Sequence, residues 1–210
     1  LQVQKYLTRF STELGINTKI LITDPINKDI RKNLILVDQI ESAPLFSLIN
    51  LANAESHNFT SEIILKAASQ HWNNDFSSFI LLSWLRNKRI NIDGLIMSDA
   101  SGLSRSNRLT TNSISKLLFK MYKHKYSKYY FSSMSLYGIR GTLDDSVYNK
   151  SLYLKFLGKT GTLDNVKSLS GIINSNQNIF FVSIIANNIS KDDNILIRAL
   201  AKISSNQSCS

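Results

Sequence analysis

The sequence predicts an α+β domain in which helices pack on an antiparallel sheet. Three observations support this class: helical apolar spacing in the middle of the chain, short β-branched runs separated by a turn near its end, and a last segment with helical spacing again. The chain has 210 residues, of which 43% are apolar. This is enough material to bury a core in one domain, or in part of a larger one.

A strand and three helices are predicted in the first half of the chain. The strand is the short β-branched run of residues 34–40. Pro44 favours a helix start because its fixed φ suits the first turn, and Asn58 with Glu62 forms a second start. Apolar residues at helical spacing follow each start and recur in a third segment. Helices are therefore expected over residues 45–55, from 58 onward, and over 75–87.

A polar loop and a fourth helix come next. Residues 92–107 hold Gly, Ser and Asp around short apolar pieces, a composition typical of a loop. Thr110 or Thr111 can cap the following helix, in which apolar residues recur at three and four positions through Tyr122.

The last third of the chain predicts β structure followed by a terminal helix. The turn-rich residues 174–178 separate two β-branched runs, so these two runs are expected to be antiparallel neighbours. Asp192 and Asp193 place acids in the first turn of an amphipathic helix, expected over residues 192–204. The predicted strands cover residues 153–157, 166–173 and 179–186.

The net charge of +10 comes from 25 Lys and Arg residues against 15 Asp and Glu residues. In the densest basic cluster, residues 120–130, four lysines alternate with four tyrosines. Such a mixture can hold phosphates and stack bases. No RNP, zinc-finger or helix-turn-helix signature accompanies it. We therefore expect no nucleic-acid partner, and keep nucleic-acid binding only as a rival interpretation.

Several other classes of protein are excluded. Cys209 is the sole cysteine, so a disulfide scaffold is excluded, and it has no neighbours suited to zinc. His57, His71 and His124 have no mutual spacing suited to a metal, so we expect no metal or other cofactor. No stretch has the length of a membrane span, and Leu1 does not open an apolar signal core. A start at Leu rather than Met suggests that the chain begins inside a longer or processed gene product.

Two polar segments embedded in apolar sequence are the candidates for chemistry: residues 101–107 and residues 158–163. In the second, Lys159 and Thr160 follow a strand-like run, and Gly161 removes a side chain where a ligand can approach the backbone. A strand that offers main-chain donors and acceptors, a hydroxyl and an ammonium is suited to a peptide ending in a carboxylate. The alternative is a surface turn that contains a lysine.

Several motifs, in order from about residue 30 to 190, resemble those of the class C low-molecular-mass penicillin-binding proteins, the D-alanyl-D-alanine carboxypeptidase/endopeptidase family. Residues 99–110 are similar to its D-G-S-G-L-S-R-x-N-R segment, with Ala100 in place of Gly. Residues 159–171 are similar to its K-T-G-T-L and V-x-S-L-S-G runs. Other matches are Ser42-Ala43-Pro44-Leu45 to S-P-P-L, residues 57–62 to D-N-x-x-A-E, and residues 137–143 to G-x-x-G-T-L.

The resemblance implies a penicillin-binding-protein/β-lactamase-like transpeptidase fold and an acyl-serine mechanism. It implies that Ser104 relays a proton and that Asn107, aligned by S-R-x-N, holds the acyl-side amide of the substrate. Ser106 occupies the position at which a strict S-x-N motif has Asn. Lys159 and Thr160 would meet the terminal carboxylate, beside Gly161, and Thr162 would offer its backbone N–H to the oxyanion.

This sequence has no S-x-x-K motif at the position where the family has its nucleophilic serine. The only S-x-x-K is Ser113-Ile114-Ser115-Lys116, which follows the Ser104 motif, whereas the family places its nucleophile well before it. We expect the nucleophile to lie upstream of these residues, the fold to be incomplete at the N-terminus, and the chain not to acylate alone. A catalytically inactive homologue that binds peptidoglycan is the main alternative. Glu62 is expected to cap its own helix.

The resemblance also implies the location and partners of the protein. Peptidoglycan stem peptides would be the substrate, with β-lactams as inhibitors, in the periplasm or another extracytoplasmic compartment. Residues 1–210 would be the C-terminal part of one penicillin-binding domain, and residues 1–40 the end of an inserted subdomain.

Overall fold

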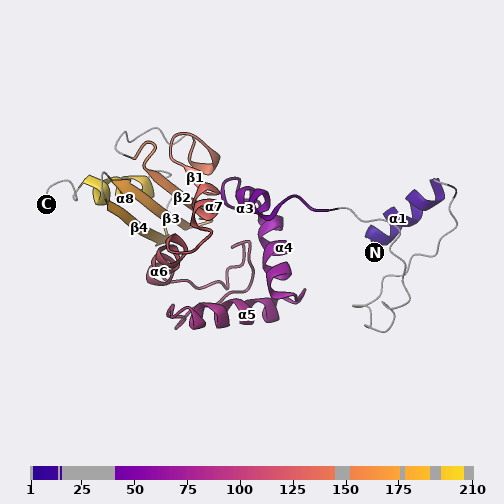
Figure 1. Cartoon of the computed structure of the whole chain (residues 1–210). Coiled ribbons are helices and arrows are strands. Elements are labelled where there is room, and N and C mark those ends of the chain that lie inside the picture. The colour runs from indigo at the N-terminus through magenta and orange to yellow at the C-terminus, as the bar shows by residue number, and fades with distance from the viewer. Residues whose placement is uncertain are drawn as a thin grey trace. The chain divides into compact units, whose positions relative to one another are not determined.

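The computed structural model describes residues 2–13, 15, 41–144, 152–175, 178–189 and 195–205 (Figure 1). The chain divides into two compact units, Leu1–Ser42 and Ala43–Ser210. In the first unit, helix α1 spans Gln2–Glu13, and Arg9 Nε lies 2.9 Å from Glu13 Oε1 one turn on. The sequence interpretation did not include this helix, and the strand predicted over residues 34–40 lies outside the described residues.

The second unit contains the four helices predicted before residue 125. The side chains that precede three of them accept hydrogen bonds from backbone N–H groups of the first turn, as N-caps do. His57 Nδ1 accepts from Thr60, Asn73 Oδ1 from Phe76, and Thr110 Oγ1 from Ser113. These helices are α3 (Leu45–Asn53), α4 (Asn58–Ser69), α5 (Asn74–Asn87) and α6 (Thr111–Tyr122). None of the described helices is long and apolar enough to cross a membrane.

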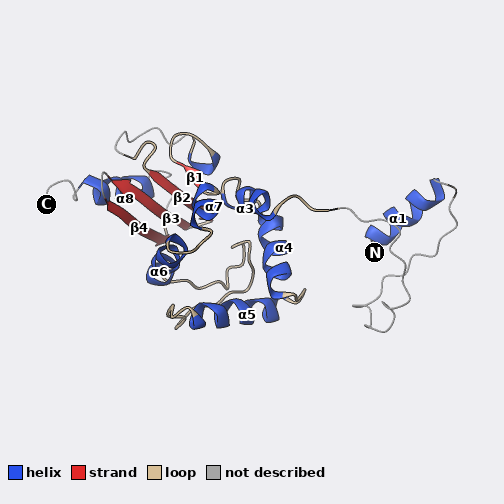
Figure 2. Ribbon diagram, in the orientation of Figure 1, coloured by secondary structure: helices blue, strands red, loops and turns tan. Residues whose placement is uncertain are grey.

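A four-stranded antiparallel sheet follows, with strand order β1-β2-β3-β4 (Figure 2). The predicted pairing of the last two strands is confirmed, and both run further toward their turn than expected. The short helix α7 (Ser127–Ser132), which precedes the sheet, was not predicted. The strands are β1 (Ser135–Leu136), β2 (Phe156–Leu163), β3 (Val166–Ser175) and β4 (Asn178–Asn187).

The sheet has a buried core on each of its faces. Alternate residues of a strand point to opposite faces, so Ile173 joins one core while Ile172 joins the other. On the first face the terminal helix α8 (Ile195–Ser205) packs through Leu196 and Leu200. On the second face α6 and α7 pack through Leu118 and Phe131, respectively. Helices on an antiparallel sheet confirm the α+β class. Asp192 and Asp193, predicted in the first turn of α8, lie outside the described residues.

Strand β2 begins and ends later in the chain than the sequence predicted. The run at 153–157 was expected to be the strand, with Lys159 after it, but residues 152–155 form a turn and β2 begins at Phe156. Leu152 and Phe156 are fully buried in the first core, which fixes the start of the strand. Consequently Lys159, Thr160 and Gly161 lie within the strand itself.

Gly171 lets β3 approach β2 closely. It pairs with Gly158, and a Cβ added to Gly171 would contact the Leu157 carbonyl oxygen and lie 2.6 Å from Gly158 Cα. Both neighbours are backbone atoms that cannot turn aside. We expect Gly171→Ala to lower the free energy of unfolding by about 2–3 kcal/mol, measured by urea denaturation of the full-length protein. Ser170→Ala adds no atom and is the control, expected to cost about 1 kcal/mol. Equal losses in the two variants would contradict the close-approach argument.

Candidate active site

Lys159 lies on an open edge of the sheet. Strand β1 pairs with only two residues of β2, Leu157 and Gly158. From Lys159 to Leu163, β2 is paired with β3 on one side, and no described strand pairs with the other side. An unpaired strand edge presents backbone N–H and C=O groups to which an extended peptide can add.

The ammonium group of Lys159 is held in place at this edge. Its Nζ donates to Ser56 Oγ at 2.6 Å and to the carbonyl oxygen of Thr160 at 2.7 Å. Ser56 belongs to the turn between α3 and α4, more than 100 residues away in the sequence. Desolvation by burial lowers the pKa of Lys159 below its ordinary value. The group is therefore positioned for a negatively charged ligand that would replace part of its lost hydration.

A chain of hydroxyl groups fixes the neighbouring Thr160. Thr160 Oγ1 donates to Thr142 Oγ1 at 2.8 Å, and Thr142 Oγ1 lies 3.1 Å from Ser135 Oγ. Ser135 Oγ in turn donates to the Ala54 carbonyl oxygen at 3.2 Å. Thr142 belongs to the short 3₁₀ helix η1 (Gly141–Leu143). The α3–α4 turn is thus connected to β2 directly through Ser56 and indirectly, by this chain of hydroxyl groups, from Ala54.

The other two β2 residues predicted for the site lie further along the same strand. Gly161 is half-buried, and a Cβ added there would meet Ser168 Oγ, the rotatable end of a side chain. Thr162 is exposed on the strand. The role of its backbone N–H toward an oxyanion stays a prediction.

The loop that contains Ser104 is organised around Asp99. The carboxylate accepts from the backbone N–H groups of Ser104 at 2.7 Å and Gly102 at 2.9 Å. It also accepts from Ser101 Oγ and from Asn107 Nδ2. Desolvation raises the pKa of Asp99, but these four hydrogen bonds outweigh it and hold the pKa below its ordinary value. Asp99 was not among the predicted site residues, although an Asp before a Gly-Ser loop is a signal for such a turn.

Asn107 has its amide group directed into the loop. Its Nδ2 donates to Asp99 Oδ1 at 2.7 Å, and its Oδ1 accepts from the Ser98 backbone N–H at 2.7 Å. Ser104 Oγ is half-buried and accepts from the Ser106 backbone N–H at 3.2 Å. Ser104 therefore has a hydroxyl proton to donate, while both ends of the Asn107 amide are already bonded.

The prediction that Glu62 caps its own helix is wrong. Its Oε1 accepts from the backbone N–H groups of Ala100 and Ser101, both at 2.9 Å. The cap of α4 is His57 instead. Glu62 thus connects α4 to the loop that contains Ser104. It accepts from other backbone N–H groups of this loop than Asp99 does.

Arg105 brings the Ser104 loop to the end of β2. Its guanidinium donates to the Asp164 carbonyl oxygen at 2.8 Å and lies 3.7 Å from the Asp164 carboxylate. Asp164 directly follows β2, so the residue next to Ser104 is bonded to the turn that ends the Lys159 strand. Ser104 and Lys159, predicted from separate motifs, lie in segments joined by this contact.

Ser113 has the wrong environment for a nucleophile. It is 5% exposed, and its Oγ donates to the Asn91 carbonyl oxygen at 2.7 Å while accepting from Thr110 Oγ1. Lys116, the lysine of the same motif, is exposed. We expect Ser113→Ala to label with fluorescent penicillin in the same amount as the wild-type full-length protein. Loss of the label with an unchanged melting temperature would make Ser113 the nucleophile.

Two lysines of residues 120–130 lie over aromatic rings of the same chain, one of them over Phe119, just before this range. Lys123 Nζ lies 4.4 Å from the centre of the Phe119 ring, and Lys125 Nζ lies 4.9 Å from that of Tyr126. These distances are typical of cation–π pairs. One Lys–Tyr pair of this cluster, Lys125 and Tyr126, therefore makes its contact within the chain. Among the described residues, no group of three or more His, Cys, Asp or Glu side chains could hold a metal ion.

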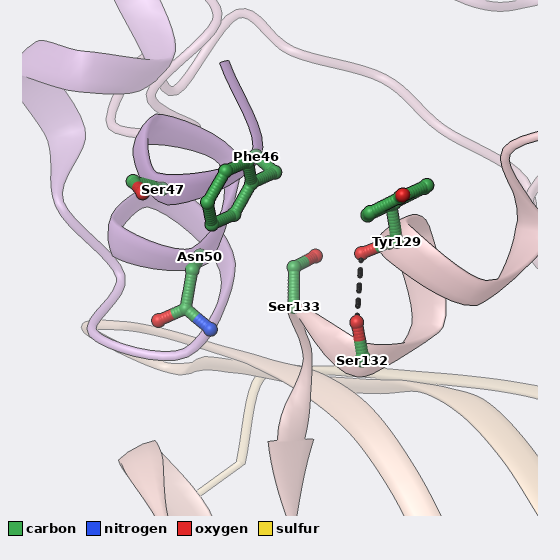
Figure 3. Close-up of a pocket in the computed structure, with 6 residues that line it drawn as sticks. All are labelled: Phe46, Ser47, Asn50, Tyr129, Ser132 and Ser133. Atoms are coloured by element: carbon green, nitrogen blue, oxygen red, sulfur yellow. Dashed lines mark hydrogen bonds between the residues drawn. The ribbon is translucent and has the colours of Figure 1, made fainter. Parts of the chain in front are cut away.

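A separate pocket of 210 Å³ lies between α3 and α7 (Figure 3). Its wall contains hydroxyl, amide and aromatic groups but no ionisable group other than the Tyr129 phenol, and Ser132 Oγ donates to the Tyr129 carbonyl oxygen at 3.2 Å. It lacks the lysine and the hydroxyl chain of the Lys159 site. The lining residues are Phe46, Ser47, Asn50, Tyr129, Ser132 and Ser133.

Several solved structures have a similar fold. Penicillin-binding protein 4 from Haemophilus influenzae, complexed with a β-lactam, matches 97% of this chain over 49% of its own, with 19% identity and a TM-score of 0.76. Another structure of that protein matches 77% of this chain over 39% of its own, with 19% identity and a TM-score of 0.67. A penicillin G-acylated predatory endopeptidase from Bdellovibrio bacteriovorus matches 79% of this chain over 45% of its own, with 17% identity and a TM-score of 0.61.

These likenesses confirm the penicillin-binding-protein-like fold, and the chain spans about half or less of the length of each of these proteins. No curated protein matches the chain. The model of the D-Ala-D-Ala carboxypeptidase 3 (S13) family matches residues 3–207, nearly all of the sequence. Together with the motifs at Ser104 and Lys159, this match shows that the chain belongs to the S13 family of D-Ala-D-Ala carboxypeptidases.

Proposed function

We propose that the chain provides the Ser104 loop and the Lys159 strand of a serine D-Ala-D-Ala carboxypeptidase/endopeptidase that acts on peptidoglycan stem peptides. The observation that supports this most directly is the half-buried Lys159 ammonium on an unpaired strand edge, with the Ser104 loop bonded to the end of that strand. Membership in the S13 family supplies the reaction class.

The substrate would add to β2 as an extended peptide. The edge of β2 beyond Gly158 supplies main-chain partners, and Lys159 supplies the positive charge for the terminal carboxylate. Thr162 would donate its backbone N–H to the carbonyl oxygen on which negative charge develops. Gly161 lies between these two points on the strand and pairs with Ser168 of β3.

The reaction would proceed through an acyl-enzyme whose nucleophilic serine, in an S-x-x-K motif, lies outside these residues. The serine Oγ gives its proton to the lysine of its motif and bonds to the carbonyl carbon before the last D-Ala. The C–N bond then breaks, and the D-Ala amine leaves with a proton relayed from that lysine. Ser104 would pass that proton to the amine, because its Oγ accepts from Ser106 and retains its own hydrogen. Water then hydrolyses the ester and restores the serine. Asn107 would position the loop through Asp99.

The same site would react with β-lactams, and the protein would work where peptidoglycan lies, outside the cytoplasm. Labelling of the full-length gene product with fluorescent penicillin tests the proposal. We expect a covalent label that survives denaturation and that unlabelled penicillin prevents. No label on a folded protein that contains an upstream S-x-x-K motif would instead favour the inactive, peptidoglycan-binding homologue.

A further inference from the structure

The pocket between α3 and α7 combines exposed aromatic rings with polar side chains that can still form hydrogen bonds. Phe46 is 57% exposed and Tyr129 is 60% exposed, so both rings are accessible to a ligand (Figure 3). Ser47 and Asn50 lie one turn apart on α3, and their side chains form no hydrogen bond among the described residues. A hydroxyl and an amide can each donate and accept. These two side chains are therefore available to a ligand that has several hydroxyl or amide groups.

The wall of this pocket at Ser133 is fixed, and it lies close to the Lys159 site. Ser133 is 2% exposed, and its Oγ accepts from Asn53 Nδ2 at 2.7 Å. The next residue, Ala54, accepts from Ser135 Oγ at 3.2 Å, which begins the hydroxyl chain to Thr160. The same end of α3 is thus bonded to the pocket and, two residues along the partner segment, to the chain that fixes β2.

The size and charge of the pocket indicate a small neutral ring as its ligand. Its volume of 210 Å³ is below the roughly 300–1,000 Å³ of pockets that hold drug-sized molecules. Among the described residues, none that carries a formal charge lines it. The C–H groups of a sugar ring are weakly positive and pack against the negative face of an aromatic ring. The hydroxyl and acetamido groups of the same sugar can bond to Ser and Asn side chains.

Exposed aromatic residues continue from this pocket to a basic surface. Tyr126 is 55% exposed, and its ring centre lies 6.4 Å from that of Tyr129. Lys125 Nζ in turn lies 4.9 Å from the centre of the Tyr126 ring. Residues 100–143 contain eight Lys and Arg residues and no Asp or Glu. A sugar polymer that carries carboxylates would therefore meet successive aromatic rings in a positively charged region.

We propose that the pocket between α3 and α7 is a saccharide subsite, which binds one N-acetylated hexosamine of a peptidoglycan glycan strand beside the peptide site. The sugar packs against Phe46 and Tyr129, and Asn50 bonds to its acetamido group. The glycan continues over Tyr126. The subsite favours intact peptidoglycan over free stem peptides, because a second contact raises the effective concentration of the polymer at the peptide site. The choice of sugar rests on the proposed function, which makes peptidoglycan the substrate.

Binding is tested with chitotriose, a trisaccharide of β-1,4-linked N-acetylglucosamine, in saturation-transfer NMR titrations of the full-length protein. We expect the wild type to bind it with a Kd on the order of 1 mM, since the contacts are few. Tyr129→Ala and Asn50→Ala should each raise this Kd about fivefold or more, whereas Tyr129→Phe keeps the ring and should change it less than about twofold. Trp72→Ala is the control and should have no effect, because Trp72 is 70% exposed but lies between α4 and α5, outside the pocket.

A second measurement compares the hydrolysis of a soluble N-acylated D-Ala-D-Ala tripeptide with that of insoluble peptidoglycan. Tyr129→Ala should lower the rate on peptidoglycan about fivefold and leave kcat/KM for the tripeptide unchanged, because the tripeptide has no sugar. Its melting temperature should stay that of the wild type. Equal losses on the two substrates would assign Tyr129 a structural role and overturn the subsite.

The outcomes separate this subsite from the proposed function. A wild type that does not bind chitotriose, or binding that is weakened by Trp72→Ala alone, would overturn the subsite. Penicillin labelling and tripeptide hydrolysis would then leave the proposed function standing. Chitotriose binding that depends on Tyr129 and Asn50, in a protein that does not label with penicillin, would support the subsite and count against the peptidase.

Discussion

Lys159→Ala in the full-length protein is expected to reduce kcat/KM for D-Ala-D-Ala peptides and the rate of acylation by penicillin about 100- to 1,000-fold. The substrate carboxylate would lose a charge-assisted partner in a partly desolvated site, a contact worth roughly 3–4 kcal/mol. Stopped-flow measurement of the acylation rate with a fluorescent penicillin checks this. Unchanged acylation would show that Lys159 does not bind the carboxylate.

Lys155→Ala is the matched control, because Lys155 precedes the same strand but is exposed. We expect it to leave both rates unchanged. The Lys159 variant should also keep its fold, since the removed ammonium is a desolvated charge whose burial disfavours the charged form. A melting temperature within a few degrees of the wild type would separate lost binding from lost structure.

The lowered pKa of Lys159 gives the wild type a distinct pH dependence. Carboxylate binding needs the charged ammonium, so kcat/KM should fall on the alkaline side at a lower pH than an ordinary lysine with a pKa of 10.5 would give. The stability changes in the opposite sense. The unfolded chain binds this proton more tightly, so the free energy of unfolding rises with pH between the folded and unfolded pKa values.

The fold could be predicted where local signals and tertiary packing agree. Of the two predicted caps, Thr110 is the one that caps α6, and the β-branched runs on either side of the turn at 174–178 give β3 and β4. Caps, β-branched runs and turns are signals that act over a few residues. The start of β2 could not be predicted. Residues 153–157 resemble a strand locally, but the burial of Leu152 and Phe156 in the first core decides where pairing begins.

The site could be predicted only for residues within recognisable motifs. Ser104 and Lys159 were predicted this way, and Arg105 joins the segments that contain them. Their roles in the site stay predictions. Asp99, Ser56 and the donors that bond to Glu62 were not predicted, because their partners lie across turns or elements. Glu62 shows the reason most clearly, since helix capping at i to i+3 is a local signal while its bonds to Ala100 and Ser101 depend on the packing of α4.

Asp99→Asn is expected to disorganise the Ser104 loop and to lower acylation by penicillin about 100-fold. Oδ1 of Asp99 accepts from Gly102 N and Asn107 Nδ2, and Oδ2 accepts from Ser101 Oγ and Ser104 N. In asparagine one of these oxygens becomes an NH₂ group, which faces donors whichever way the amide is turned. At least two hydrogen bonds are lost, at a cost of about 2–4 kcal/mol in unfolding free energy.

The pH dependence of stability tests whether the charge of Asp99 is responsible. Desolvation raises the pKa of Asp99, but the hydrogen bonds from Asn107, Ser104, Gly102 and Ser101 together lower it by more. The pKa in the folded protein therefore lies below that in the unfolded chain. The stabilisation is therefore present above the unfolded pKa and is lost as pH falls through the folded pKa. We expect urea titrations to show the largest difference in free energy of unfolding between wild type and Asp99→Asn at pH 7. This difference should become smaller in acid. If this difference in free energy stayed constant as the pH fell through the folded pKa of Asp99, the carboxylate charge would not be what holds the loop. Ser104 would then be positioned by the bonds of Glu62 and Arg105.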